Sequence, residues 1–314
     1  AMLFGRTDID RIVLNEISLW SGGTQEADDP EAHKYLPEIQ RLLLERKNLE
    51  AQKLLEQHFV ARSKGSCNGR GATCHYGCYQ VLGELSLDWG SNSTVKNYRR
   101  ILDLEKAMAT TTFERNGAQI EQRAFADFKN DLLWVKIRSN KPLEVKIALN
   151  RKENATTRYE GNRIVLTGIL PDEDKEGMHF ASVIEVNVDG TLQATPSALA
   201  VTNAKEIVLK ISAATNYNYL NGGLTKDDIL KKAVSYIEKS LKDFERAYTE
   251  SKPLYQELFN RNRWMSKPNA TTESLTTFER LERFHKDEKD ALMPVLYYNF
   301  GRYLLICSSR KGLL

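Results

Sequence analysis

The pattern of apolar and polar positions divides the chain into a β-rich first part and a helical last part. From about residue 80 to residue 213, apolar side chains recur at every second position, which is typical of strands with one buried and one exposed face. Leu133, Val135 and Ile137 form one such run, and a second run covers residues 143–149. Roughly ten or more short segments of this kind follow one another, so we predict a sandwich of antiparallel sheets rather than a βαβ fold.

Two glycine-containing dipeptides mark tight turns within the β-rich part. Asn116-Gly117 and Asp189-Gly190 each lie between two short alternating runs. Both dipeptides favour the positive φ angles of a two-residue hairpin, so we predict a hairpin at each. Near the start of the chain, residues 2–5 and 12–14 are two further strand candidates.

A helical insertion is predicted at about residues 30–60. Pro30 is placed where a first-turn proline is tolerated, and the apolar residues that follow recur at helical spacing, at Leu36, Ile39, Leu42 and Leu43. Asn48 is suited to cap a second short helix, whose apolar side consists of Leu49, Leu54, Leu55 and Phe59. Residues 62–78 form a loop rich in Gly, Ser and Cys.

After Tyr217 the apolar spacing becomes helical. Thr225 and Asp228 resemble a capping box, and they precede a long helix whose apolar face begins at Ile229 and which Pro253 should end. Further helices are expected at about residues 254–264, 272–284 and 287–309. The last of these is apolar on nearly every side, so it should be buried among other helices, yet few helices precede it in the chain.

Charge and hydropathy exclude two classes of partner. The 314 residues include 45 basic and 42 acidic side chains, which are mostly interleaved and give a net charge of +3. Nucleic-acid binding needs a one-sided basic patch, so we expect no nucleic-acid partner. The most apolar stretch, residues 291–307, is interrupted by Pro294, Asn299 and Arg302 and is too short to span a membrane. No signal peptide is visible, but the chain opens in a strand candidate, so we expect further sequence before residue 1.

Several segments resemble, in the same order, the motifs of glycoside hydrolase family 95. Residues 11–23, RIVLNEISLWSGG in one-letter code, resemble its L-N-E-x-x-L-W-S-G-G signature. That signature follows an opening strand, which residues 1–5 match. Further resembling segments are residues 50–52, 77–85, 98–104, 177–180, 213–217 and 301–310. Each motif is modest by itself, but together they span the whole chain and identify it as the N-terminal portion of a family member.

The resemblance implies an architecture and an activity. The fold class is then mainly β with a helical C-terminal part. Residues 1–217 would form a β-sandwich of the galactose-mutarotase-like supersandwich type, 218–286 a helical linker and 287–314 the start of an incomplete (α/α)6 barrel. The activity would be that of an α-L-fucosidase, which removes α-linked fucose from glycans with inversion and needs no cofactor. The substrate would be a fucosylated oligosaccharide, and the parent enzyme would be secreted or periplasmic.

The resemblance assigns no catalytic residue to this chain. In the family, a Glu acts as the acid, and an Asn helped by an Asp activates water, which is the division of roles that inversion requires. These residues lie in the barrel, beyond a segment in which Lys311 here replaces the family's proline. No position of this sequence matches them, so we expect a non-catalytic portion whose partner is the missing barrel. Two alternatives stay open: a stand-alone carbohydrate-binding module, or part of a related sandwich-plus-barrel disaccharide phosphorylase.

The candidate pocket residues come from the resembling motifs and from one loop. They are Asn15, Glu16, Trp20, Arg70, Tyr79 and Gln80. Trp stacks on sugar rings, but it also fills interfaces well, so these residues either shape a sugar pocket or brace the sandwich against a neighbouring domain. Arg70 lies among glycines in a loop that is suited to reach toward an active-site mouth.

Three cysteines gather in the same loop. Cys67, Cys74 and Cys78 lie near His75, but the spacing lacks the two-residue gap that is typical of zinc sites, so we expect no metal. We favour a disulfide among the three, with free thiols as the alternative. The other histidines are scattered and are expected to be surface or packing residues. Cys307 is expected only to pack.

Overall fold

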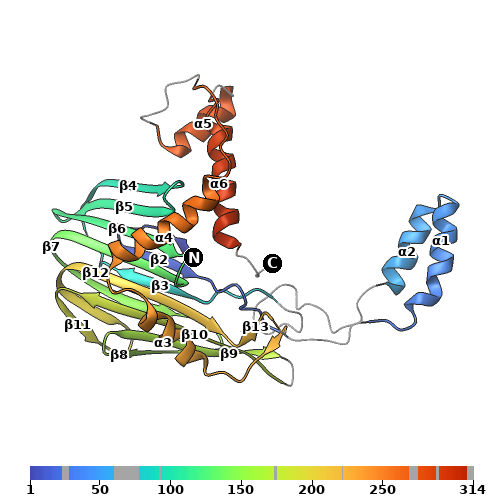
Figure 1. Cartoon of the computed structure of the whole chain (residues 1–314), viewed down its shortest axis with the longest axis horizontal. Helices are drawn as coiled ribbons and strands as arrows, with labels where there is room; N and C mark the ends of the chain where they lie inside the picture. The colour runs from blue at the N-terminus through green and yellow to red at the C-terminus, as the bar shows by residue number, and fades with distance from the viewer. Residues whose placement is uncertain are drawn as a thin grey trace.

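The computed structural model describes residues 1–22, 28–59, 78–91, 93–172, 175–220, 222–268, 275–287 and 290–309. Within these ranges the chain is a β-sandwich followed by four helices, with a helical hairpin inserted near the start (Figure 1). The predicted fold class, mainly β with a helical C-terminal part, is therefore confirmed.

A single antiparallel sheet of twelve strands supplies the sandwich. Eight strands follow one another in the order β1-β2-β3-β7-β12-β10-β9-β8, while β6, β5 and β4 branch from β7, and β11 pairs with β12. The strands of this sheet are β1 (Met2–Leu3), β2 (Ile9–Leu14), β3 (Gly83–Asp88), β4 (Val95–Asp103), β5 (Met108–Arg115), β6 (Ala118–Asp127), β7 (Leu132–Asn150), β8 (Ala155–Glu160), β9 (Arg163–Asp172), β10 (Lys175–Val188), β11 (Thr191–Ala194) and β12 (Leu199–Thr215). A separate pair, β13 (Tyr217–Asn218) and β14 (Gly223–Leu224), follows β12.

Strand β7 belongs to both layers of the sandwich. Its residues 132–139 pair with β6, and its residues 146–150 pair with β3, so the two groups of strands branch from the same edge of one strand. The pairing of β7 with β12 shifts register on both sides of Ala204, and Asn203 has a φ of 55° there. Such irregularities bend a sheet. The bent sheet encloses a core that contains Ile12 and Leu85 from one group of strands and Phe113 and Ile120 from the other.

One of the two predicted hairpins forms and the other does not. Asn116 and Gly117 have φ angles of 50° and 73° and connect β5 to β6, which pair with each other. Asp189-Gly190 instead connects β10 to β11, and both of these strands pair with β12, so the hairpin prediction was wrong. The Asp189 carboxylate accepts the backbone N–H groups of Lys205 and Glu206, which holds the junction against the bend of β12.

The insertion forms a helical hairpin that packs on itself. A 3-10 turn, η1 (Ala32–Tyr35), leads into α1 (Leu36–Leu44), and α2 (Asn48–His58) returns along it. Ile39, Leu42 and Ala51 form its small core, and Figure 1 shows the hairpin apart from the strands. Two capping predictions were wrong: the first-turn proline of α1 is Pro37 rather than Pro30, and Lys47 rather than Asn48 is the N-cap of α2.

Two helices, α3 (Ile229–Lys239) and α4 (Phe244–Phe259), cover the outer face of the sheet (Figure 1). They bury a second core in which Ala233 and Phe244 pack near Trp134 and Val183 of the strands. The sequence predicted one helix from residue 229 to Pro253, but the helix breaks at Ser240, and the carboxylates of Asp228 and Asp243 cap the two pieces. Capping of the second piece outweighs the continuous apolar periodicity.

Pro253 lies inside α4 rather than at its end, which corrects the predicted helices on both sides of it. The proline is exposed, whereas Tyr255 and Phe259, four residues apart, are buried. Burial of this stripe holds the helix together across the missing N–H, because tertiary packing supplies most of the stability of a helix.

Two more helices follow, α5 (Thr277–Asp287) and α6 (Met293–Ser308). Thr276 and Glu279 form a capping box, so α5 begins five residues later than predicted. Helix α6 packs on α4 and α5, and Met293 is its one buried residue. The helices of the described chain do not bury this apolar helix, since Tyr297 is 78% and Leu305 65% exposed, as the small number of preceding helices led us to expect. No helix in the described ranges has the length and hydropathy needed to cross a membrane.

Candidate functional site

The candidate residues meet at the end of the sheet where β2 and β12 finish and β3 begins. Antiparallel pairing of Leu14 with Gly83 brings the segment after β2 beside the segment before β3. Strand β12 ends at Thr215, which lies opposite Phe180 of β10. The loops at this end therefore come from residues far apart in sequence. We call the group described below the Glu16 cluster: Asn15, Glu16, Ser18, Trp20, Tyr79, Thr215, Tyr219, Lys232 and Tyr236.

Trp20 and Tyr79 form an exposed aromatic pair. They are joined by an isolated backbone bridge, and their rings meet edge to face with centroids 5.6 Å apart. Trp20 is 48% and Tyr79 43% exposed, although each ring has an anchor. The Trp20 Nε1 donates to the carbonyl of Ile17 at 3.2 Å, and the Tyr79 side chain bonds that of Asn15. A fixed, half-exposed aromatic surface is suited to stack on a sugar ring.

Glu16 is a half-buried carboxyl beside this pair. It accepts the backbone N–H of Ser18 at 2.7 Å and the Ser18 hydroxyl at 2.6 Å. Burial raises the pKa of Glu16, and these hydrogen bonds oppose the shift without cancelling it. The negative charge of Asp131 raises this pKa further, whereas the positive charge of Lys232 lowers it. The site therefore holds a carboxyl that keeps its proton more readily than an exposed glutamate does.

Hydroxyl and amino groups surround Glu16 on the side of α3. Ser18 also hydrogen-bonds Thr215, which ties the loop after β2 to the end of β12. Lys232 of α3 donates its Nζ to the Thr215 carbonyl at 3.2 Å. Burial raises the pKa of both Tyr219 and Tyr236, and the charge of Glu16 adds to each shift. The Glu16 cluster thus combines aromatic rings with donors and acceptors, as carbohydrate sites require.

Gln80 stabilises the backbone next to Trp20 and Tyr79. It is buried, and its Nε2 lies 3.4 Å from both the Ser21 Oγ and the Cys78 carbonyl. Arg151 donates to the Gln80 Oε1 at 3.4 Å and stacks over the Phe180 ring at 5.0 Å. Burial lowers the pKa of Arg151. Gln80 therefore holds the backbone that carries Tyr79, and its own amide faces no open surface.

The structure brings five of the six predicted residues into one region. Asn15, Glu16, Trp20, Tyr79 and Gln80 lie together, whereas Arg70, Cys67 and Cys74 fall outside the described residues. The disulfide among Cys67, Cys74 and Cys78 stays a prediction. Over the residues that the structure describes, no group of three or more His, Cys, Asp or Glu side chains could hold a metal ion.

Sequence reasoning missed Tyr219, Lys232 and Tyr236. One signal was present, because Lys232 and Tyr236 are four residues apart and therefore share a helix face. Nothing in the sequence indicates that this face turns toward the loop after β2. That placement depends on the packing of α3 against β10 and β12.

Comparison with known families adds to this geometry. Residues 1–219 match the model described as "Glycosyl hydrolase family 65, N-terminal domain", which is more than half of the chain. The sandwich belongs to that family. Residues 243–314 match the "Glycosyl hydrolase family 95 catalytic domain", so the resemblance to family 95 is confirmed. The second match begins at Asp243, the N-cap of α4, and so before residue 287, where the barrel was expected to start.

Curated relatives carry fucosidase names. The chain is 27% identical to "Alpha-L-fucosidase 2" of Arabidopsis thaliana, and the match covers 99% of the chain. It is also 27% identical to "Probable alpha-fucosidase A" of Aspergillus niger, again over 99% of the chain. The chain spans about 40% of the length of both relatives.

Two solved structures resemble the chain weakly. A protein assigned as a kojibiose phosphorylase from the human microbiome gives a TM-score of 0.40 at 17% identity, over 54% of this chain and 25% of that one. A bacterial glucoamylase complexed with acarbose gives 0.30 at 11% identity, over 54% and 29%.

Proposed function

We propose that this chain is the non-catalytic N-terminal portion of a glycoside hydrolase that removes α-linked L-fucose from glycans with inversion. The observation that carries the proposal is co-linearity: the relatives with fucosidase names align over 99% of the chain, and the family 95 match at residues 243–314 follows the sandwich match at residues 1–219. The Glu16 cluster is consistent with this proposal, since it offers a sugar-like ligand both stacking and hydrogen bonds.

In this proposal the sandwich supplies one wall of the substrate pocket. Trp20 and Tyr79 contact a sugar of the glycan with their exposed faces, and Asn15 fixes the orientation of Tyr79. Glu16 and Ser18 position the loop and offer hydrogen bonds at its base. Gln80 is a positioning residue, because its amide binds the backbone behind the pair.

The acid and base come from outside this chain in this proposal. Inversion requires one group to protonate the leaving oxygen and another to activate a water on the opposite face of the sugar. Glu16 keeps a proton readily, but a single carboxyl held against Ser18 does not provide both roles. We assign the acid and the base to the part of the relatives' length that this chain does not span. We also propose that the parent enzyme is secreted or periplasmic.

The exposed helix α6 favours a missing domain over a stand-alone binding module. A stand-alone module is the second candidate, because Trp20 and Tyr79 are exposed enough to bind sugar without cleaving it. However, the exposed apolar side chains of α6 have no use in such a module. A contiguous apolar surface of this kind usually marks an interface.

The direct test is release of fucose from 2′-fucosyllactose. This chain alone should release none, and robust turnover would contradict a non-catalytic role. The full gene product that contains this chain should release fucose, and NMR should detect the inverted β-anomer first. Absence of fucosidase activity from that longer product would overturn the proposal.

Variants of the aromatic pair test the pocket wall in the longer product. W20A and Y79A should raise KM for 2′-fucosyllactose about ten-fold or more, which corresponds to roughly 1.4 kcal/mol or more. W264A is the matched control, because Trp264 is equally exposed but contacts Tyr298 of α6 rather than the Glu16 cluster. Equal effects of W20A and W264A would favour a bracing role at a domain interface.

A further inference from the structure

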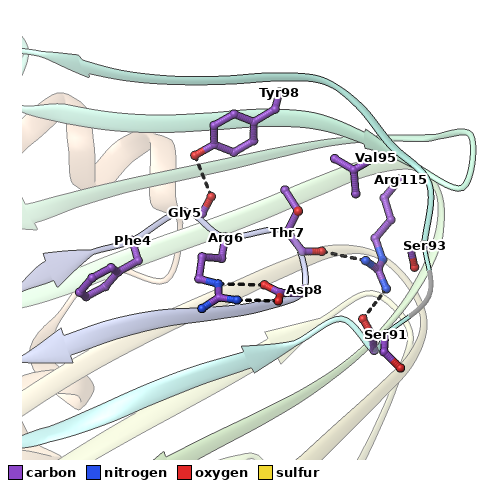
Figure 2. Close-up of a pocket in the computed structure, with 11 residues that line it drawn as sticks. Phe4, Gly5, Arg6, Thr7, Asp8, Ser91, Ser93, Val95, Tyr98 and Arg115 are labelled. Carbon is purple, nitrogen blue, oxygen red and sulfur yellow. Dashed lines mark hydrogen bonds and ion pairs between the residues drawn. The ribbon is translucent and has the colours of Figure 1, made fainter. Parts of the chain in front are cut away.

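A pocket lies at the opposite end of β2 from the Glu16 cluster. Its volume is about 520 Å³, which is within the range of small-molecule sites. It is lined by the turn between β1 and β2, the segment after β3, the start of β4 and the end of β5 (Figure 2). Because β2 has six residues, the pocket is on the order of 20 Å from the Glu16 cluster.

Side chains of β4 and β5 hold the floor of this pocket rigid. The Tyr98 hydroxyl donates to the Gly5 carbonyl at 2.9 Å, and Arg100 donates to the Phe4 carbonyl at 2.6 Å. Arg115 donates to the Thr7 carbonyl at 2.7 Å (Figure 2). Gly5 has a φ of 67°, and a Cβ there would lie 2.9 Å from the hydroxyl of Thr111, so the turn requires glycine. A preformed floor lowers the cost of ordering a ligand site.

Arg115 is buried and its charge is used within the protein. Besides Thr7, it donates to the carbonyls of Trp89 and Gly90 at 2.5 and 2.7 Å. Burial lowers the pKa of Arg115. Its role is to join the turn after β1 to the end of β3, so the pocket does not present it as a free cation.

Arg6 and Asp8 form a neutral pair at the mouth. The Arg6 Nε and Nη2 donate to the two carboxylate oxygens of Asp8 at 3.0 and 2.7 Å, and both side chains are about half exposed. The Asp8 carboxylate also accepts the backbone N–H of Ile9, and among the described residues the Arg6 Nη1 makes no hydrogen bond. The remaining lone pairs and this nitrogen suit neighbouring hydroxyl groups. Ser91 and Ser93, on the segment after β3, add hydroxyls to the lining (Figure 2).

Tyr98 supplies the aromatic surface. Tyr98 is 49% exposed, and its hydroxyl is anchored on the Gly5 carbonyl, which fixes the orientation of the ring. A fixed aromatic face beside an Asp–Arg pair and two serines suits a neutral ring that carries several hydroxyls. An anionic ligand is disfavoured, because Asp8 neutralises Arg6 and carbonyl oxygens occupy Arg115.

We infer that this pocket is a second carbohydrate-binding site, which takes one neutral sugar unit of a glycan remote from the Glu16 cluster. The inference depends on the lining of the pocket and holds whether or not the parent enzyme is a fucosidase. With this pocket, the sandwich has two sugar-binding sites at opposite ends of β2. They can bind one long glycan or two separate glycans.

The test is an NMR titration of the full chain with lactose, L-fucose and sodium sulfate, with chemical shifts followed for residues around Tyr98. Saturable shifts with at least one sugar at millimolar concentration are expected, and Y98A should weaken them about ten-fold or more. Y98F keeps the ring and should weaken binding much less. S91W fills the pocket from an exposed position and should abolish binding even if Y98A disturbs the fold.

W20A is the control for the other site and should leave the shifts around Tyr98 unchanged. Three results would overturn the inference: no saturable shifts with either sugar, shifts with sulfate alone, or sugar shifts that W20A removes and S91W does not. Circular dichroism and the thermal midpoint of each variant establish that loss of binding is not loss of fold.

Discussion

At the scale of single residues, Glu16 links the site to pH. Burial raises its pKa above 4.5, so the folded chain holds a proton at pH values where the unfolded chain has lost it. Stability from this group is therefore present below pH 4.5 and is lost as the pH rises through the folded pKa. We predict that E16Q flattens this part of the stability profile, measured as the free energy of unfolding by urea between pH 4 and pH 7.

The matched control for E16Q is E279Q. Glu279 is fully exposed, and its pKa is lowered by its cap on Thr276, so E279Q should change the profile in the opposite sense or by little. An unaltered pH profile in E16Q would mean that the carboxyl is solvated in solution.

Gly168 is the second residue with a direct consequence. A Cβ there would lie 2.0 Å from the Asn154 carbonyl and 2.4 Å from the Phe180 ring. Neither the backbone oxygen nor the buried ring has room to yield, so G168A should destabilise the sandwich by about 1–3 kcal/mol or more. Chemical denaturation of G168A beside G223A tests this, because a Cβ at Gly223 meets no atom within 4 Å. Equal stability of the two variants would contradict the close approach of Asn154 and Phe180 to Gly168 of β9.

At the scale of elements, Arg302 decides how α6 attaches to α4. Its guanidinium donates to the carbonyls of Phe259 at 2.7 Å, Asn262 at 2.9 Å and Leu258 at 3.4 Å, which lie at and beyond the end of α4. Hydrogen bonds from a charged donor contribute about 1.5–3 kcal/mol. We predict that R302M speeds hydrogen exchange in α6 while the strands keep their protection.

R261M is the comparison for R302M. Arg261 lies two residues beyond the end of α4 and forms an exposed ion pair with Glu257, which is the kind of pair that contributes little to stability. The hydrogen-exchange pattern of R261M should match that of the unaltered chain. If both variants loosen α6 equally, general charge rather than the three carbonyl contacts holds the helix.

The elements that sequence reasoning predicted are those with a local signal. Alternation revealed the strands, and the Asn116-Gly117 turn has the positive φ angles that its residues favour. Asp189-Gly190 has the same local signal, but backbone N–H groups of Lys205 and Glu206 capture the Asp189 side chain. That interaction depends on the bend of β12, which no local pattern records. The break at Ser240 accompanies the cap that Asp243 provides for α4, whereas burial of Tyr255 and Phe259 carries α4 across Pro253.

In the candidate site too, sequence motifs indicate some residues, whereas only the packing of distant segments places the others. Asn15, Glu16, Trp20, Tyr79 and Gln80 lie in two sequence motifs, so they could be named in advance. Lys232 and Tyr236 join them only through the docking of α3, and Tyr219 joins them because it follows β13 at the end of β12. The pocket beside Tyr98 had no sequence signal, since its polar residues come from four separate segments and form no motif.

At the scale of the whole molecule, α6 presents an apolar surface. Tyr297, Phe300, Leu304 and Leu305 are between 39% and 78% exposed. Such a surface should bind a hydrophobic dye and promote self-association. We predict that the double variant Y297E/L305E lowers dye fluorescence and the apparent mass in solution without lowering the thermal midpoint.

L220E is the control for this double variant. Leu220 is 94% exposed and follows β13 rather than belonging to α6. It should leave dye binding unchanged. An equal drop in both variants would place the dye elsewhere, and the proposed interface with a further helical domain would lose its support.

The shared strand β7 has a consequence for how this chain folds. Its partners lie far away in sequence: β3 precedes it by more than forty residues, and β12 follows nearly fifty residues after it ends. Contacts of such long range are slow to form, because much chain entropy is lost before they contribute stability. Since both layers pair with β7, neither can melt while the other stays intact. We therefore expect slow, all-or-none refolding of residues 1–215, with the helices after them free to fray at lower denaturant concentrations.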